Sequence, residues 1–268
     1  MTAIRRLGLA CSLALALLPA SAAAADPPRP VIAAATRILQ HATLITKPGL
    51  YTLGSDFAVG AGEKAIVVQA DDVTIDLGGR TLSGPGGPGT VGIEVDGARN
   101  VGIRNGSLVS FGVGVLLQNV VNARLEGLRI DGEDLGGAPP NIEIGILLID
   151  SRGVVVTDNQ ITETFLGIFV RGAGSGGNRI AGNTLAGGEH GQLGICYNPA
   201  PGASAGGPSG DLVYANLVSR FQTGIALSAD SRSNVLRENT LATFATGVAD
   251  ASAGGNALVD NVTSKLAP

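Results

Sequence analysis

The chain has 268 residues, with 22 acidic side chains against 18 lysines and arginines and a net charge of −4. This excess of negative charge argues against a partner made of nucleic acid or anionic lipid. Tryptophan is absent, three residues are tyrosine, six are phenylalanine and 41 are glycine. So few rings exclude a core built on large aromatic anchors and favour short strands joined by many tight turns.

Residues 1–25 have the pattern of a signal peptide. Two arginines precede an apolar run from Leu7 to Leu18, and "ASAAAAD" offers a small-residue cleavage site after Ala25. The apolar run is shorter than the ~20 residues that cross a membrane as a helix. We therefore predict an exported protein, secreted or periplasmic, with no membrane span in the mature chain. Cleavage would leave Cys196 as its one cysteine, which excludes an intrachain disulfide.

Residues 26–64 are predicted to form an N-terminal cap and a first, irregular coil. The segment "VIAAATRILQ" (31–40) has the composition of a helix, which would cover the strand edges at the start of a stack. Leu44 to Val59 then reads as two or three strands around a Lys-Pro-Gly turn.

From residue 65 to residue 268 the sequence is repetitive. A "G-[IV]-x-[LV]" strand recurs at intervals of 22, 31, 22, 27, 30 and 23 residues. A period near 22 is too short for a strand followed by a helix, so each repeat must consist of strands joined by tight corners. Such coils stack about 4.8 Å apart and form parallel sheets along the stack. The glycines that open these strands are Gly92, Gly114, Gly145, Gly167, Gly194, Gly224 and Gly247.

Each repeat also contains a second strand, which has two aliphatic positions with a polar position between them. The aliphatic positions form two inward-facing columns, one from Ile103 to Leu258 and one from Leu108 to Thr263. The polar column ends in five asparagines. An asparagine amide can donate to one neighbouring coil and accept from the other, and asparagine tolerates the left-handed backbone of a corner. A catalytic residue is needed only once in a protein, whereas this asparagine recurs in five successive repeats. The recurrence therefore indicates a structural ladder. Its members are Asn159, Asn183, Asn216, Asn239 and Asn261, and a second corner gathers Asn178, Asp211, Asn234 and Asn256.

The segment "DDVTIDLGGRTLSG" (71–84), followed by these coils, resembles the right-handed parallel β-helix, or pectin-lyase-like, superfamily with its PbH1 repeats. The resemblance covers about Thr43 to the C-terminus and implies an all-β right-handed parallel β-helix of about eight coils. The resemblance does not predict a particular enzymatic reaction. "NTL" stands where polygalacturonases have "NTD", "EHG" is only faintly similar to "GHG", and "RIK" and the "DPHD" of mannuronan epimerases are missing. A polysaccharide lyase, glycoside hydrolase or epimerase-like activity therefore stays open.

Three repeats carry insertions, at 131–143, 186–193 and 198–210, and the first two leave the stack at the same corner. Carboxylates gathered at this corner can divide acid and base roles in glycosidic cleavage, or bind Ca²⁺ through their oxygens. A histidine there can titrate near neutral pH. The alternative is that acidic side chains only keep exposed turns soluble. No other cofactor or metal is predicted. The acidic corner contains Asp131, Glu133, Asp134, Glu143, Glu163, Glu189 and His190.

The third position of each "G-[IV]-x-[LV]" strand should face outward, and four consecutive members of this column are apolar. A bare apolar stripe is unusual and predicts a docking surface for a protein or for the apolar face of a sugar, unless a loop folds over it. Cys196 belongs to this stripe and is expected to pack, since no base or cation adjoins it. The predicted binding residues are Leu116, Leu147, Phe169 and Tyr197.

Together these features predict an exported β-helix protein that associates with, or modifies, an acidic or neutral polysaccharide through a groove walled by the insertions. The alternative is a non-catalytic scaffold that presents the stripe and the loops to an envelope protein. Export and fold favour the polysaccharide. The missing motifs and the scarcity of tyrosine and tryptophan favour the scaffold.

Overall fold

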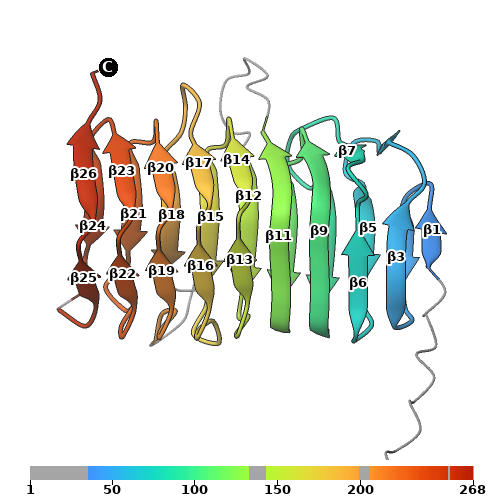
Figure 1. Cartoon of the computed structure of the whole chain (residues 1–268), viewed down its shortest axis with the longest axis horizontal. Coiled ribbons are helices and arrows are strands. Elements are labelled where there is room, and N and C mark those ends of the chain that lie inside the picture. Colours follow the sequence, from blue (N-terminus) through green and yellow to red (C-terminus); the bar gives the residue numbers. More distant parts are fainter. Residues whose placement is uncertain (1–35, 133–142, 199–205, 253, 268) are drawn as a thin grey trace, which may run out of the picture. The chain divides into compact units, whose positions relative to one another are not determined.

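The computed structural model describes residues 36–132, 143–198, 206–252 and 254–267 as a stack of parallel strands (Figure 1). Within these ranges there is no helix, and hence no helix able to span a membrane. One sheet, the back sheet, receives one strand from each coil. The predicted parallel β-helix is therefore confirmed, with nine coils in the described ranges where about eight were predicted. The back sheet contains β2 (Thr43–Ile45), β5 (Lys64–Val68), β8 (Val91–Asp96), β10 (Val113–Gln118), β12 (Ile144–Ile149), β15 (Leu166–Arg171), β18 (Leu193–Asn198), β21 (Thr223–Leu227) and β24 (Thr246–Asp250).

The other sheet, the front sheet, faces the viewer in Figure 1. Two coils cross it as single long strands, whereas most others contribute two short strands separated by a bend. Its strands are β1 (Arg37–Leu39), β3 (Gly49–Leu53), β4 (Phe57–Ala58), β6 (Val73–Asp76), β7 (Thr81–Ser83), β9 (Arg99–Val109), β11 (Val121–Asp131), β13 (Val155–Thr157), β14 (Gln160–Thr162), β16 (Arg179–Ala181), β17 (Thr184–Ala186), β19 (Leu212–Tyr214), β20 (Leu217–Ser219), β22 (Val235–Arg237), β23 (Thr240–Thr243), β25 (Ala257–Val259) and β26 (Val262–Lys265).

The predicted N-terminal helix is wrong over its described part. Residues 37–39 form β1, which pairs in parallel with β3. Leu39 is 4% exposed and fills the first layer of the core, whereas Ile38 faces outward and is 64% exposed. This alternation is the period of a strand, and pairing with the next coil outweighs a helix propensity that is weak in itself.

The core consists of aliphatic side chains stacked coil on coil. In the front sheet, Ile103 pairs with Leu125 and Leu108 pairs with Ile130, and the predicted columns continue in this register. Members up to Leu236 and Leu241 are at most 3% exposed. The last coil differs, because Leu258 is 48% exposed and no further described coil covers it.

The glycine of the back-sheet repeat is required by close packing. A Cβ atom on Gly145 would lie 2.5 Å from Ile161 Cγ2 and 2.6 Å from the carbonyl oxygen of Gly167. Both atoms belong to the interior or to the next coil, so even alanine would push the coils apart. Gly145 thus marks the place where the back strand passes close to the core of the front sheet.

Hydrogen bonds connect the five predicted ladder asparagines along the stack. In the first four, Nδ2 donates to the Oδ1 of the next asparagine at 2.8–3.0 Å and also to a backbone carbonyl of the preceding coil. Asn261, the last, donates to the carbonyl of Leu236. The left-handed backbone expected at the asparagine occurs instead one residue earlier, at Asp158, Gly182, Ala215, Glu238 and Asp260. The asparagine can therefore turn its amide inward while its neighbour makes the bend.

A second polar column contains a buried carboxylate among asparagines. Asp211 Oδ1 accepts the backbone N–H of Asn178 at 2.7 Å, and the N–H of Asp211 donates to Asn234 Oδ1 at 2.9 Å. Burial raises the pKa of Asp211 to about 6, although the hydrogen bonds that Asn178 donates to its carboxylate act in the opposite direction. The same burial, with Asp211 close by, raises the pKa of the Tyr197 phenol well above its ordinary value.

Candidate functional site

The predicted corner lies at the upper ends of β11, β14 and β17, where Asp131 ends β11 and Glu163 directly follows β14. Gly132 N–H donates to the carbonyl of Thr162, and Glu163 N–H donates to the carbonyl of Ala186, both at 2.9 Å. These backbone bonds place Asp131 and Glu163 on neighbouring coils at the same edge of the front sheet. The loop that carries Glu189 belongs to the following coil.

Two glutamates meet around glycines at this corner. A Cβ atom on Gly132 would lie 2.5 Å from Glu143 Oε2 and would also overlap the carbonyl oxygen of Glu163. The Glu163 carboxylate lies against Gly188 in the same way. Glu143 is 7% exposed and Glu163 is half-buried. The corner therefore holds carboxylates in space that only glycine leaves open.

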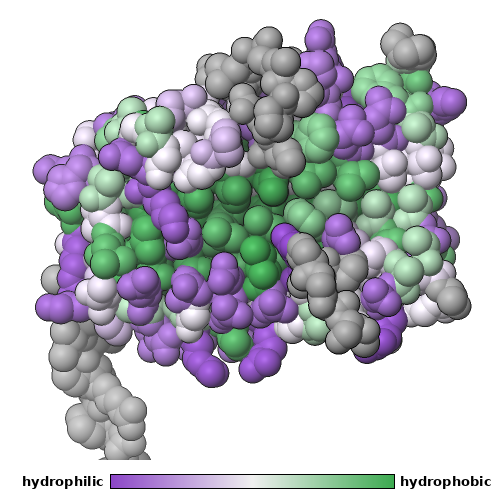
Figure 2. Space-filling model, turned by 180° about the vertical axis from the view of Figure 1, so that it is seen from behind, coloured by the Kyte–Doolittle hydropathy of each residue, from purple (hydrophilic) through white to green (hydrophobic). Residues whose placement is uncertain are grey.

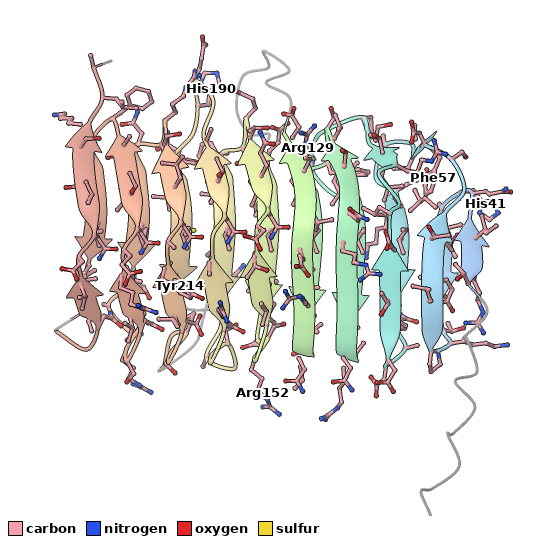
Figure 3. All side chains as sticks on the ribbon, in the orientation of Figure 1. His41, Phe57, Arg129, Arg152, His190 and Tyr214 are labelled. Carbon is pink, nitrogen blue, oxygen red and sulfur yellow. The ribbon has the colours of Figure 1, made fainter. Side chains whose placement is uncertain are left out.

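The rest of the acidic set is more scattered. Glu189 and His190 lie on an exposed turn, with His190 at the upper end of the molecule (Figure 3). Glu133 and Asp134 lie outside the described residues. Among the described residues, no three His, Cys, Asp or Glu side chains are close enough to share a metal ion. A Ca²⁺ site at this corner thus stays a prediction without support from a ligand cluster.

A polar hollow opens on the front sheet directly beside the corner. It has a volume of about 200 Å³ and is lined by Arg129, Ile130, Asp131, Gln160 and Thr162. Arg129 pairs with Gln160 and Asp131 with Thr162 across neighbouring coils, so four polar side chains share one face. The sequence prediction missed Arg129, although its two-residue spacing from Asp131 places both side chains on the same side of the strand and could have indicated this hollow. Arginine, carboxylate, amide and hydroxyl groups together offer both donors and acceptors.

The predicted outer stripe lies on the back sheet, where Figure 2 shows a continuous hydrophobic region. Leu116, Leu147, Phe169, Cys196 and Ala226 pair in register on successive strands. Leu147 and Cys196 are 8% and 3% exposed, and the other three side chains are half-buried.

Tyr197, the fourth predicted binding residue, does not join this stripe. It is the next residue after Cys196, so its side chain turns to the opposite side of the strand and joins the core, where it is 3% exposed. Burial raises the pKa of the Cys196 thiol, which therefore stays protonated and packs as a small apolar side chain.

Comparison with known proteins identifies the family. Residues 72–265 match the family described as periplasmic copper-binding protein (NosD). The chain belongs to the NosD family. No curated protein matches the chain.

Solved structures similar to this NosD-family chain share its fold. The Dettilon tailspike protein is 17% identical with a TM-score of 0.57, over 85% of this chain and 54% of its own. The periplasmic alginate epimerase AlgG is 13% identical with a TM-score of 0.53, over 76% and 57%. An alginate lyase from Paenibacillus sp. is 16% identical with a TM-score of 0.53, over 81% and 93%. This chain thus spans little more than half the length of the first two proteins.

The family description raises the question of copper, and the residues present do not fit it. Copper sites in proteins are built from imidazole, thiolate and thioether ligands. This NosD-family chain contains two histidines, two cysteines and one methionine. Among the described ones, His41 and His190 are in different coils and Cys196 is a buried, protonated thiol. No step of a mechanism is therefore assigned to copper.

Proposed function

We propose that this NosD-family protein is exported and associates with a polysaccharide through the polar hollow beside the corner. The hollow carries the proposal. It offers Arg129, Asp131, Gln160 and Thr162 on one face of two adjacent coils. Sugar hydroxyls donate and accept hydrogen bonds, and planar guanidinium, carboxylate and amide groups match them in pairs.

The position of the hollow supports binding of a chain longer than one sugar. It lies at the edge of the front sheet where Glu163 and the insertion at 186–193 follow on successive coils. An extended ligand that runs along the stack would cross one coil about every 4.8 Å, and the coil after the hollow presents Thr184 in register with Gln160. Two proteins with the same fold are named for action on alginate, a polysaccharide, which makes this ligand class the first to test.

The proposal is for binding, without a reaction. Acid–base cleavage of a glycosidic bond needs two carboxyl groups at a defined separation on either side of the bond. At the corner, Glu143 and Glu163 are held in glycine-lined positions, and Glu189 and His190 lie apart on an exposed turn. The absence of the polygalacturonase and mannuronan epimerase motifs from the sequence agrees with this choice.

A binding assay on the full chain tests the proposal. We expect the double substitution Arg129→Ala and Asp131→Ala to weaken binding at least tenfold in affinity electrophoresis against a panel of acidic and neutral polysaccharides. Arg152→Ala is the matched control, because Arg152 lies at the opposite, lower end of the coils (Figure 3). Unchanged affinity in the double variant would reject the hollow as the site, and a panel without any binder would reject polysaccharide as the ligand.

The same panel distinguishes binding from catalysis and tests the Ca²⁺ prediction. Each polysaccharide is incubated with the protein, with and without Ca²⁺, and analysed for unsaturated or reducing ends. We expect no new ends in either condition. If the parent protein produces new ends and the Glu163→Gln variant does not, the corner has a catalytic role.

A further inference from the structure

The back sheet contains a recess at a place unrelated to the polar hollow. It has a volume of about 390 Å³ and lies over β15, β18 and β21. Its apolar lining includes Leu166, Phe169, Leu193, Cys196 and Ala226. The three strands belong to the back sheet, whose outer face carries the hydrophobic region in Figure 2.

The recess exists because side-chain size falls along one outward column. Phe169, Cys196 and Ala226 pair in register on three neighbouring strands, which are about 4.8 Å apart. The Phe169 ring forms one wall of the recess, and the smaller side chains of Cys196 and Ala226 form its floor. Leu166 and Leu193, which pair with each other on β15 and β18, form a second wall. The difference in side-chain size along this column therefore accounts for the hollow.

A polar group at the edge of the recess has no partner. Ser228 lines the recess, and its hydroxyl oxygen is buried without a hydrogen bond to any described residue. A buried hydroxyl of this kind costs free energy unless a hydrogen-bonding group reaches it. Asn198 lies in the same lining and adds a second polar side chain next to the apolar floor.

The dimensions favour a small molecule over a second copy of the chain. Three strands cover only about 14 Å along the stack. A stable protein–protein interface buries about 800 Å² on each partner, far more than such a recess provides. Ligand pockets of roughly 300–1,000 Å³ with an apolar lining and a few polar groups are typical of small-molecule sites.

We propose that this recess binds a small amphipathic molecule or substituent, with an apolar body of one or two rings against Phe169 and Ala226. One hydroxyl group of this molecule would bond to the Ser228 hydroxyl, which has to rotate about its Cα–Cβ bond to reach the recess. Phe169 contributes a ring surface, and the Cys196 sulfur contributes a soft, polarizable contact. The proposal is independent of polysaccharide binding, since it concerns the other sheet.

The test uses 1-naphthol, whose fluorescence reports binding, and naphthalene, which has the same rings without the hydroxyl. We expect saturable binding of 1-naphthol to the full chain. Ala226→Leu fills the recess and should weaken binding of both probes at least tenfold. Ala249→Leu is the control, because Ala249 is the next member of the same column and is outside the lining.

The hydroxyl contact is tested separately with Ser228→Ala. We expect this variant to weaken 1-naphthol roughly three- to tenfold, the range for one neutral hydrogen bond, and to leave naphthalene unchanged. Thermal melting of each variant verifies that the stack is folded. Absence of saturable binding, or equal binding in a folded Ala226→Leu variant, overturns the proposal. Equal losses of both probes in Ser228→Ala overturn the assigned hydrogen bond.

Discussion

A single buried carboxylate makes the stability of this protein depend on pH. Asp211 occupies a position where the neighbouring coils have Asn178 and Asn234. An asparagine there donates from Nδ2 to the next member, as Asn234 does to Asn256 at 3.0 Å. An ionised aspartate has no such donor, whereas a protonated aspartate does. The chemistry of the column therefore agrees with the raised pKa of Asp211.

The sign of the effect follows from proton linkage. The pKa of Asp211 is raised from 3.8 to about 6 on folding. As pH rises from about 4 to about 6, the unfolded chain releases this proton first, so the folded state loses stability by about 3 kcal/mol. We expect Asp211→Asn to remove this loss and to be more stable than the parent at pH 7, with the two nearly equal at pH 4.

Urea unfolding at a series of pH values measures this difference. The exposed Asp96 provides the control, because Asp96→Asn should leave the pH dependence between 4 and 6 in place. An Asp211→Asn variant that is less stable than the parent at pH 7 would show that the ladder needs the carboxylate.

At the scale of elements, the asparagine ladder stabilises the bends between the paired strands of the front sheet. Asn216 accepts hydrogen bonds from Asn183 at 3.0 Å and donates to Asn239 and to the carbonyl of Ile180 at 2.9 Å. It is 1% exposed, so groups left without partners there have no access to water. We expect Asn216→Ala to lower the free energy of unfolding by about 2–4 kcal/mol.

The end of the ladder gives an internal comparison. Asn261 is half-buried and has no following ladder member among the described coils. Asn261→Ala should therefore cost less than half as much as Asn216→Ala in the same denaturant titration. Equal losses of unfolding free energy in the two variants would indicate that each asparagine stabilises the protein on its own, without a contribution from its neighbours in the ladder.

The sequence predicted the elements well wherever one position recurs in every coil. Aliphatic columns, back-strand glycines and ladder asparagines each repeat with the period, and the structure places all three at equivalent points of successive coils. The prediction failed for β1, where pairing with the next coil makes a strand of a segment predicted as a helix. It also failed at the bends of the front sheet, where the left-handed backbone lies one residue before the asparagine. The left-handed bend at Ala215 and Glu238 is an example, since neither residue type favours that backbone.

The candidate site was less predictable, for a physical reason. The repeat fixes which side of a strand a residue faces, so the outer stripe and the polar face with Arg129 and Asp131 can be read from spacing. It does not fix how irregular loops turn, and these carry Glu189 and His190. Tyr197 shows the sensitivity of such predictions, because a shift of one residue moves a side chain from the surface into the core.

At the scale of the whole molecule, the distribution of ligand side chains decides what metal the stack can hold. His41 precedes β2 and His190 precedes β18, and six strand spacings of the back sheet separate these coils, about 29 Å. Figure 3 shows the two histidines well apart along the stack. Cys196 is in β18 but buried, and burial disfavours the thiolate that a metal would need.

We therefore expect the chain to retain less than about 0.1 equivalent of copper after equilibrium dialysis, because a lone imidazole holds copper too weakly without a second or third ligand. The measurement is metal analysis by mass spectrometry after loading with Cu(II) or, under reducing conditions, Cu(I). His41→Ala and His190→Ala should leave the content unchanged. One equivalent of copper that disappears in His190→Ala or Cys196→Ser would contradict this expectation, and would require the coil of β18 to open so that the thiol reaches the metal.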